Sequence, residues 1–162
     1  NLIIQKLFGN LTNKKIGILG FAFKSGTNDT RESPAIQIVK DLLNEGAQIS
    51  IHDPKVNPSD IEKDLGVHQQ LFNNSEKRYQ NINGTWIFQK NIKETIENAD
   101  AVVILTEWED YTNLNWEKLS SYMVKPSWLF DARNLIDLDS LQKIEIYSWQ
   151  VGNGSNLKKE RI

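Results

Sequence analysis

One segment of the sequence gathers most of the side chains that could bind a charged ligand. It comprises residues 21–34, FAFKSGTNDTRESP, and contains two cations, several hydroxyl groups and a flexible glycine. A helix that begins after Ser33 would add unpaired backbone N–H groups, which favour anions. The segment is therefore suited to a phosphate or pyrophosphate.

The two cations of this segment, Lys24 and Arg31, would act differently on an anion. Lys24 is a mobile point charge for one oxygen, whereas the planar guanidinium of Arg31 can engage two oxygens at once. Asp29 and Glu32 cancel their formal charge, so the alternative is a polar loop that pairs with itself. The segment matches neither the glycine-rich dinucleotide fingerprint nor a P-loop.

Outside this segment, two residues could each have one of two roles, and the composition argues against a metal site. Asp53 could bind a ribose hydroxyl or form a turn, and Trp108 could line a pocket or cap the sheet. The chain has no cysteine, and its two histidines have no partner at ligand spacing. We therefore expect no metal site, and an exposed imidazole at both His52 and His68. Nothing in the sequence supplies a convincing catalytic nucleophile.

Hydrophobic periodicity predicts alternating strands and helices that would position these residues. Strands are expected at 15–20, 47–52, 85–88, 101–105, 128–131 and 144–147, and helices at 2–8, 34–45, 59–65, 92–98 and 116–122. Ser59 is the expected cap of its helix, and 66–84 is an expected surface insertion. Right-handed crossovers then give an α/β fold with a doubly wound, mainly parallel sheet. Residues 20–33, 53, 106–110 and 131–134 should converge at its ligand-binding edge.

Length and composition limit the classes of protein that fit. The 162 residues, 39% hydrophobic and 25% charged, suit one globular domain. A net charge of −2 argues against a nucleic-acid binder. No apolar run approaches the roughly 18 residues of a membrane helix, so we expect a cytoplasmic protein with no membrane partner. Because the first residue is Asn rather than Met, we expect a piece of a longer protein.

Four segments, in this order, resemble the C-terminal domain of the UDP-glucose 6-dehydrogenases, within the UDP-glucose/GDP-mannose dehydrogenase family. They are residues 21–34, HDPKV at 52–56, VILTEW at 103–108 and FDAR at 130–133. The first is specific for nucleotide-sugar dehydrogenases, and TEW favours the UDP-glucose branch. The resemblance implies a Rossmann-like domain at 11–162 that binds UDP-glucose or UDP-glucuronate, preceded at 1–10 by the end of a central linker helix.

The resemblance also implies roles for individual residues. Those on the substrate would be Phe23, Lys24, Ser25, Gly26, Thr27, Asn28, Asp29, Thr30 and Arg133. Arg31 would reach across a cleft to NAD, which is bound mainly by an N-terminal domain missing from this chain. Ala132 stands where glycine is common in the family, and Asn134 where a second basic residue can occur.

The family's nucleophile is a cysteine in the preceding part of the protein. The resemblance therefore implies that this chain alone is inactive, whereas the full-length protein, as a homo-oligomer, converts UDP-glucose and two NAD into UDP-glucuronate. Two alternatives remain open: a domain of a UDP-N-acetylmannosamine or GDP-mannose dehydrogenase, or a noncatalytic Rossmann-like assembly module. The assembly module would show no nucleotide-specific stabilisation.

Overall fold

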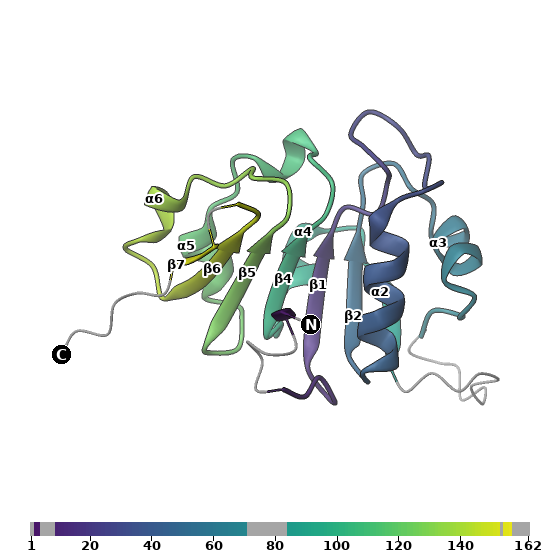
Figure 1. Ribbon diagram of the computed structural model, residues 1–162, viewed down its shortest axis with the longest axis horizontal. Coiled ribbons are helices and arrows are strands. Elements are labelled where there is room, and N and C mark those ends of the chain that lie inside the picture. The colour runs from purple at the N-terminus through teal and green to yellow at the C-terminus, as the bar shows by residue number, and fades with distance from the viewer. Residues whose placement is uncertain (1, 4–8, 71–83, 153, 157–162) are drawn as a thin grey trace.

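The protein folds around one seven-stranded sheet with the strand order β3-β2-β1-β4-β5-β6-β7 (Figure 1). The computed structural model describes residues 2–3, 9–70, 84–152 and 154–156. The strands are β1 Lys15–Leu19, β2 Gln48–His52, β3 Thr85–Phe88, β4 Ala101–Ile104, β5 Ser127–Asp131, β6 Ile146–Gln150 and β7 Gly154–Asn156. The first six are parallel, and β7 pairs antiparallel with β6. The expected mainly parallel α/β sheet is confirmed, with β4 in its centre.

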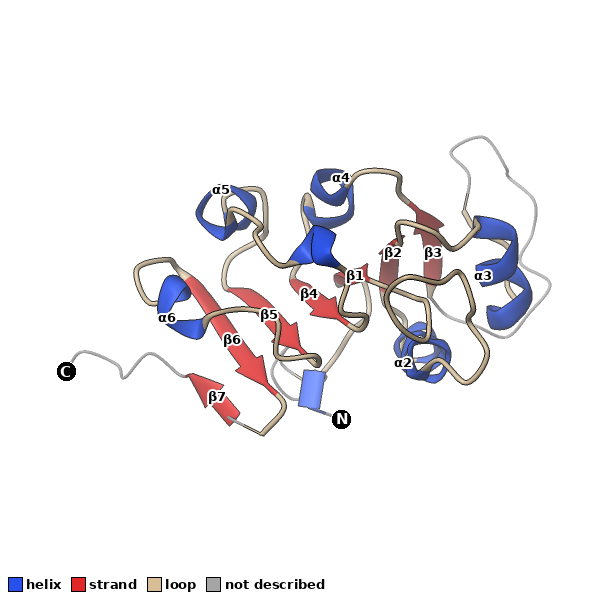
Figure 2. Cartoon of the chain, turned by 90° about the horizontal axis from the view of Figure 1, so that it is seen from above, coloured by secondary structure: helices blue, strands red, loops and turns tan. Residues whose placement is uncertain are grey.

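Helices cover both faces of this sheet. They are α2 Pro34–Asn44, α3 Pro58–Leu65, α4 Ile92–Ile96, α5 Trp116–Ser120 and α6 Leu138–Leu141, with a 3-10 helix, η1, at Glu109–Tyr111. Figure 2 looks along the strands and shows α2 on one face and α4 and α5 on the other. Strands β4 and β5 are buried at every position. This double coverage explains why β4, with the sequence AVVI, is a continuous apolar run rather than an alternating pattern.

The structure differs from the prediction at several element ends. Helix α3 begins at Pro58, so Asn57 rather than Ser59 occupies the cap position, because proline suits the first helical residue. Helix α4 ends two residues early, because Glu97 leaves the helical conformation with a ψ of 128° and Asn98 then adopts a left-handed φ of 60°. Strand β6 begins two residues late, because the N–H of Ile144 still bonds to the end of α6. Helix α6 and strand β7 were not predicted.

Two predicted segments lie wholly or partly outside the described residues. Of the expected helix at 2–8, only residues 2–3 are described, and they are helical. Of the expected surface insertion at 66–84, residues 71–83 are not described. Within the described ranges, every helix falls short of the length and apolar character that a membrane crossing requires.

Candidate functional site

The segments predicted to converge do meet at one edge of the sheet. The arrowheads of β1, β2, β4 and β5 in Figure 1 point to the edge where the loop at 20–33 rises. The strand order reverses between β1 and β4, which is where doubly wound sheets bind ligands. The segments that follow β1 and β4 touch each other there, since the Thr106 hydroxyl donates to the carbonyl of Ala22 at 2.8 Å.

The loop at 20–33 starts from a rigid base formed by two buried residues. The N–H groups of Phe21 and Ala22 donate to Asp53 Oδ2 at 2.8 and 3.0 Å. Their carbonyl oxygens accept from the hydroxyls of Ser33 and Thr106, both at 2.8 Å. All four backbone polar groups are therefore bonded, and the loop leaves the sheet in one fixed direction.

Asp53 forms a turn and does not offer its carboxylate to a ribose. It is 4% exposed, and its Oδ1 accepts from the N–H groups of Lys55 and Val56 at 2.9 and 3.0 Å. Its Oδ2 also accepts from the ring N–H of Trp108 at 3.2 Å. A carboxylate has about four lone-pair sites, and five protein donors occupy them when the two from the loop base are included. Trp108, at 6% exposure, correspondingly caps the sheet.

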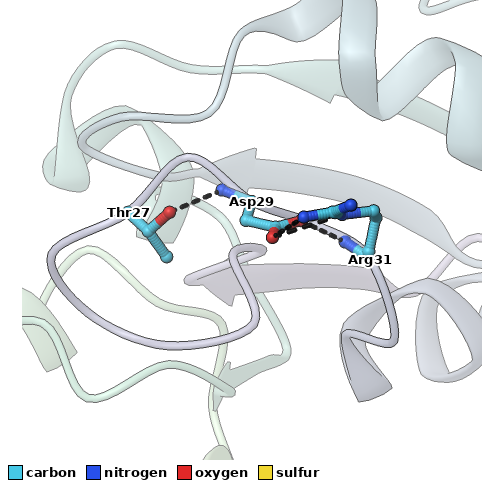
Figure 3. A network of polar contacts seen from close by, with 3 residues as sticks. All are labelled: Thr27, Asp29 and Arg31. Carbon is cyan, nitrogen blue, oxygen red and sulfur yellow. Dashed lines mark hydrogen bonds and ion pairs between the residues drawn. The ribbon is translucent and has the colours of Figure 1, made fainter.

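Beyond its base, the loop closes on itself through local polar contacts. The N–H of Phe23 donates to the carbonyl of Asp29 at 2.8 Å, and the N–H of Asp29 donates to Thr27 Oγ1 at 3.0 Å. The Asp29 carboxylate accepts from the backbone and guanidinium of Arg31 (Figure 3). These hydrogen bonds lower the pKa of Asp29 to about 2. Internal pairing, the alternative open from the sequence, therefore holds for Arg31.

Lys24 and Phe23 are neighbouring exposed side chains of the loop. Lys24 is exposed, and among the described residues it has no ion-pair partner. Phe23 exposes 45% of its surface to solvent. A cation and an apolar ring thus stand next to each other at the edge of the sheet where ligands bind.

Arg133 is held beside the same loop by Glu107. Its Nε donates to Glu107 Oε2 at 2.6 Å, and its guanidinium forms an ion pair with the same oxygen. The backbone of Ser25 lies close enough to Glu107 to help lower the pKa of its carboxyl group. Partial burial acts to raise the pKa of Glu107, but the hydrogen bonds it accepts and the charge of Arg133 together bring the pKa below its usual value. The sequence alone did not indicate this role for Glu107, although Glu107 directly precedes Trp108.

The prediction of an exposed imidazole is wrong for His52 and correct for His68. His52 is 7% exposed, and its Nδ1 lies 2.8 Å from the hydroxyl of Tyr111, which donates to the His52 carbonyl. Burial lowers the pKa of His52, although two neighbouring carboxylates act against this. His68 is exposed and lies 2.7 Å from a carboxylate oxygen of Glu62. In the described part of the chain, no group of three or more acidic, histidine or cysteine residues could hold a metal.

Residues 17–138 match the family model described as the UDP-glucose/GDP-mannose dehydrogenase family, UDP binding domain. UDP-glucose 6-dehydrogenase 4 of Arabidopsis thaliana is 37% identical over 159 residues, and UDP-glucose 6-dehydrogenase 1 of Glycine max is 35% identical. Each comparison covers 94% of this chain and 32% of the relative. The chain thus spans about a third of the length of these curated relatives.

Solved structures share the fold. A dehydrogenase of NDP-N-acetyl-D-galactosaminuronic acid from Methanosarcina mazei has a TM-score of 0.70 at 22% identity, over 94% of this chain and 27% of that one. A UDP-glucose dehydrogenase from Pyrobaculum islandicum has a TM-score of 0.57 at 22% identity, over 83% of this chain and 25% of that one. At these identities the likeness shows the fold alone.

Proposed function

The chain belongs to the UDP-glucose/GDP-mannose dehydrogenase family, and on that premise we propose that it binds the nucleotide-sugar in an NAD-dependent UDP-glucose 6-dehydrogenase. The whole protein would oxidise UDP-glucose to UDP-glucuronate with two NAD. This chain would contribute recognition of the nucleotide rather than the chemical step, because it contains no cysteine to act as a nucleophile.

The meeting of Ser25 and Arg133 at Glu107 carries this proposal. A diphosphate is recognised by backbone N–H groups together with a guanidinium fork. Here the Arg133 guanidinium bonds to Glu107, and the backbone of Ser25 lies beside the same carboxylate. An anionic ligand at this edge would find the same donors. Lys24, from the same loop, would add a point charge for a phosphate oxygen, and Phe23 an apolar surface for the sugar or base.

The loop leaves open space beside Gly26. Gly26 has a φ of 81°, and a Cβ added there would meet no atom within 4 Å. A ligand could therefore approach the backbone closely at Gly26. The side chains of Ser25, Thr27, Asn28 and Thr30 would supply polar contacts along it.

Arg31 would have a different role: it would contact the NAD that the neighbouring domain binds. Its side chain is 88% exposed and paired with Asp29, and a planar guanidinium suits a pyrophosphate. NAD, when bound, supplies the hydride acceptor. We place most of its binding site in an N-terminal domain of the same protein, in a homo-oligomer of the cytoplasm.

Calorimetric titration of UDP into the chain tests the proposal. Replacing Lys24 by alanine should weaken UDP binding by about 1 to 3 kcal/mol, the range for a hydrogen bond to a charged group. Lys63→Ala, at an exposed position on α3, is the matched control and should leave the affinity unchanged. GDP in place of UDP tests the nucleotide preference. Absence of UDP binding, or equal affinity in Lys24→Ala and the wild type, would contradict the proposal.

A further inference from the structure

The carboxylate of Asp53 connects three loops of the ligand edge from below. Its Oδ2 accepts from Phe21 and Ala22 after β1 and from Trp108 after β4. Its Oδ1 accepts from the turn that follows β2, at Lys55 and beyond. A buried charge is costly unless it is hydrogen-bonded, and five protein donors bond to this carboxylate. The carboxylate and its donors therefore hold one another in place.

The loop at 23–30 depends on that base for its attachment to the sheet. Its own bonds, from Phe23 to Asp29 and from Asp29 to Thr27, close the loop on itself. They do not fix where the closed loop stands relative to β1. That position is set one step earlier, at Phe21 and Ala22, whose N–H groups both bond to Asp53. The hydroxyls of Ser33 and Thr106 bond to the carbonyls of the same two residues.

We propose that Asp53 is a positioning residue of the nucleotide site, which sets where Lys24 and the N–H of Ser25 stand without itself contacting the ligand. The inference rests on the proposed function of this loop. Because Trp108 directly follows Glu107, the same carboxylate also steadies the backbone from which Glu107 reaches Arg133. Asp53 would thus align the two sides of the site with each other.

The two oxygens of Asp53 allow a sharp substitution. Asparagine keeps the shape of the side chain but replaces one acceptor oxygen with an NH₂ group, which can only donate. Asp53→Asn can therefore satisfy the turn after β2 or the link between the loops, but not both. A buried donor facing other donors is unfavourable, so the link between the loops is weakened while the side-chain volume is retained.

Titration of UDP into the purified chain distinguishes a positioning role of Asp53 from a general loss of stability. Leu65→Ala is the control, because it creates a cavity at a residue that is 3% exposed and is the last residue of α3, outside the loop at 20–33. After correction for the folded fraction, Asp53→Asn should weaken UDP binding at least tenfold and Leu65→Ala less than twofold. Binding by Asp53→Asn within twofold of the wild type would overturn the proposal.

Amide hydrogen exchange without ligand gives a second readout that separates this inference from the proposed function. Exchange at Phe21, Ala22 and Ser25 should be faster by at least tenfold in Asp53→Asn, and unchanged relative to the rest of the chain in Leu65→Ala. If the wild type binds no UDP, the proposed function fails, but this measurement still decides whether Asp53 positions the loop. If Asp53→Asn does not fold, Trp108→Phe can replace it, because it removes one donor to Asp53. Exchange at the same three amides should then be faster than in the wild type, but by a smaller factor. Unchanged loop exchange in the folded variant would overturn the inference.

Discussion

Replacing Gly20 with alanine should destabilise the chain far more than the same change at Gly26. Both glycines have a positive φ, 95° and 81°, but their surroundings differ. A Cβ at Gly20 would lie 2.5 Å from the Cβ and Oγ1 of Thr106 and 2.7 Å from its backbone nitrogen. At Gly26 the same atom would meet nothing within 4 Å. The pair therefore separates backbone strain from steric overlap.

The magnitude follows from these two contributions. A left-handed backbone costs an ordinary residue roughly 1 to 2 kcal/mol, and this applies at both positions. Overpacking of a tight interior adds typically about 1 to 3 kcal/mol, and it applies at Gly20 alone. Thr106 is fully buried and its hydroxyl is bonded to Ala22, so it cannot move aside without losing that bond. We expect a loss of about 2 to 5 kcal/mol for Gly20→Ala and about 1 to 2 kcal/mol for Gly26→Ala.

Urea unfolding, monitored by circular dichroism, measures both losses. The slope of the free energy of unfolding against urea should be the same in the two variants and the wild type, so that midpoints report stability directly. Equal destabilisation by the two substitutions would refute the reasoning. It would mean that Thr106 does not fill the space beside Gly20.

Three further outcomes are expected. Arg31→Ala should leave the affinity of the chain for UDP within twofold in calorimetry, because Arg31 is exposed and already paired with Asp29; a large loss would place it on the substrate instead. The lowered pKa of His52 means that the unfolded chain binds protons more readily below about pH 6.5. The free energy of unfolding should therefore fall as the pH is lowered through this range, and fall less steeply in His52→Gln; identical pH profiles in urea titrations would argue against this. Finally, the purified chain with UDP-glucose and NAD should form no NADH by absorbance, and robust turnover would require a nucleophile within it.

The parts of the fold that the sequence predicted are those set by neighbouring residues. The run at β4 is apolar on both faces, and Ser33 with Pro34 marks the start of α2, where the Ser33 side chain accepts from the N–H of Ala35. The contact of Arg31 with Asp29 was also foreseeable as an alternative, since only two positions separate them. Such features depend on local spacing, which a sequence displays directly.

The features that the sequence did not predict depend on contacts between residues that are far apart in the sequence. His52 is buried because Tyr111, 59 positions away, places its hydroxyl against the ring. The choice between ribose contact and turn at Asp53 likewise depended on donors from Phe21 and Trp108, which come from other loops. The segments 106–110 and 131–134 were predicted to converge, but the specific bond between Glu107 and Arg133 was not, because the two residues follow different strands.

The pairing of β1 with β4 has a consequence for how the chain folds. Strands β1 to β3 come from residues 15–88 and strands β4 to β7 from 101–156, so each half of the sheet is continuous in sequence. Each half can form from contacts of shorter sequence separation, whereas the seam between them joins positions as distant as Ala22 and Thr106, 84 residues apart. A nucleotide held by Lys24 on one half and Arg133 on the other would bind only the joined state and so stabilise it. Its binding would then slow separation of the halves and protect the seam during unfolding.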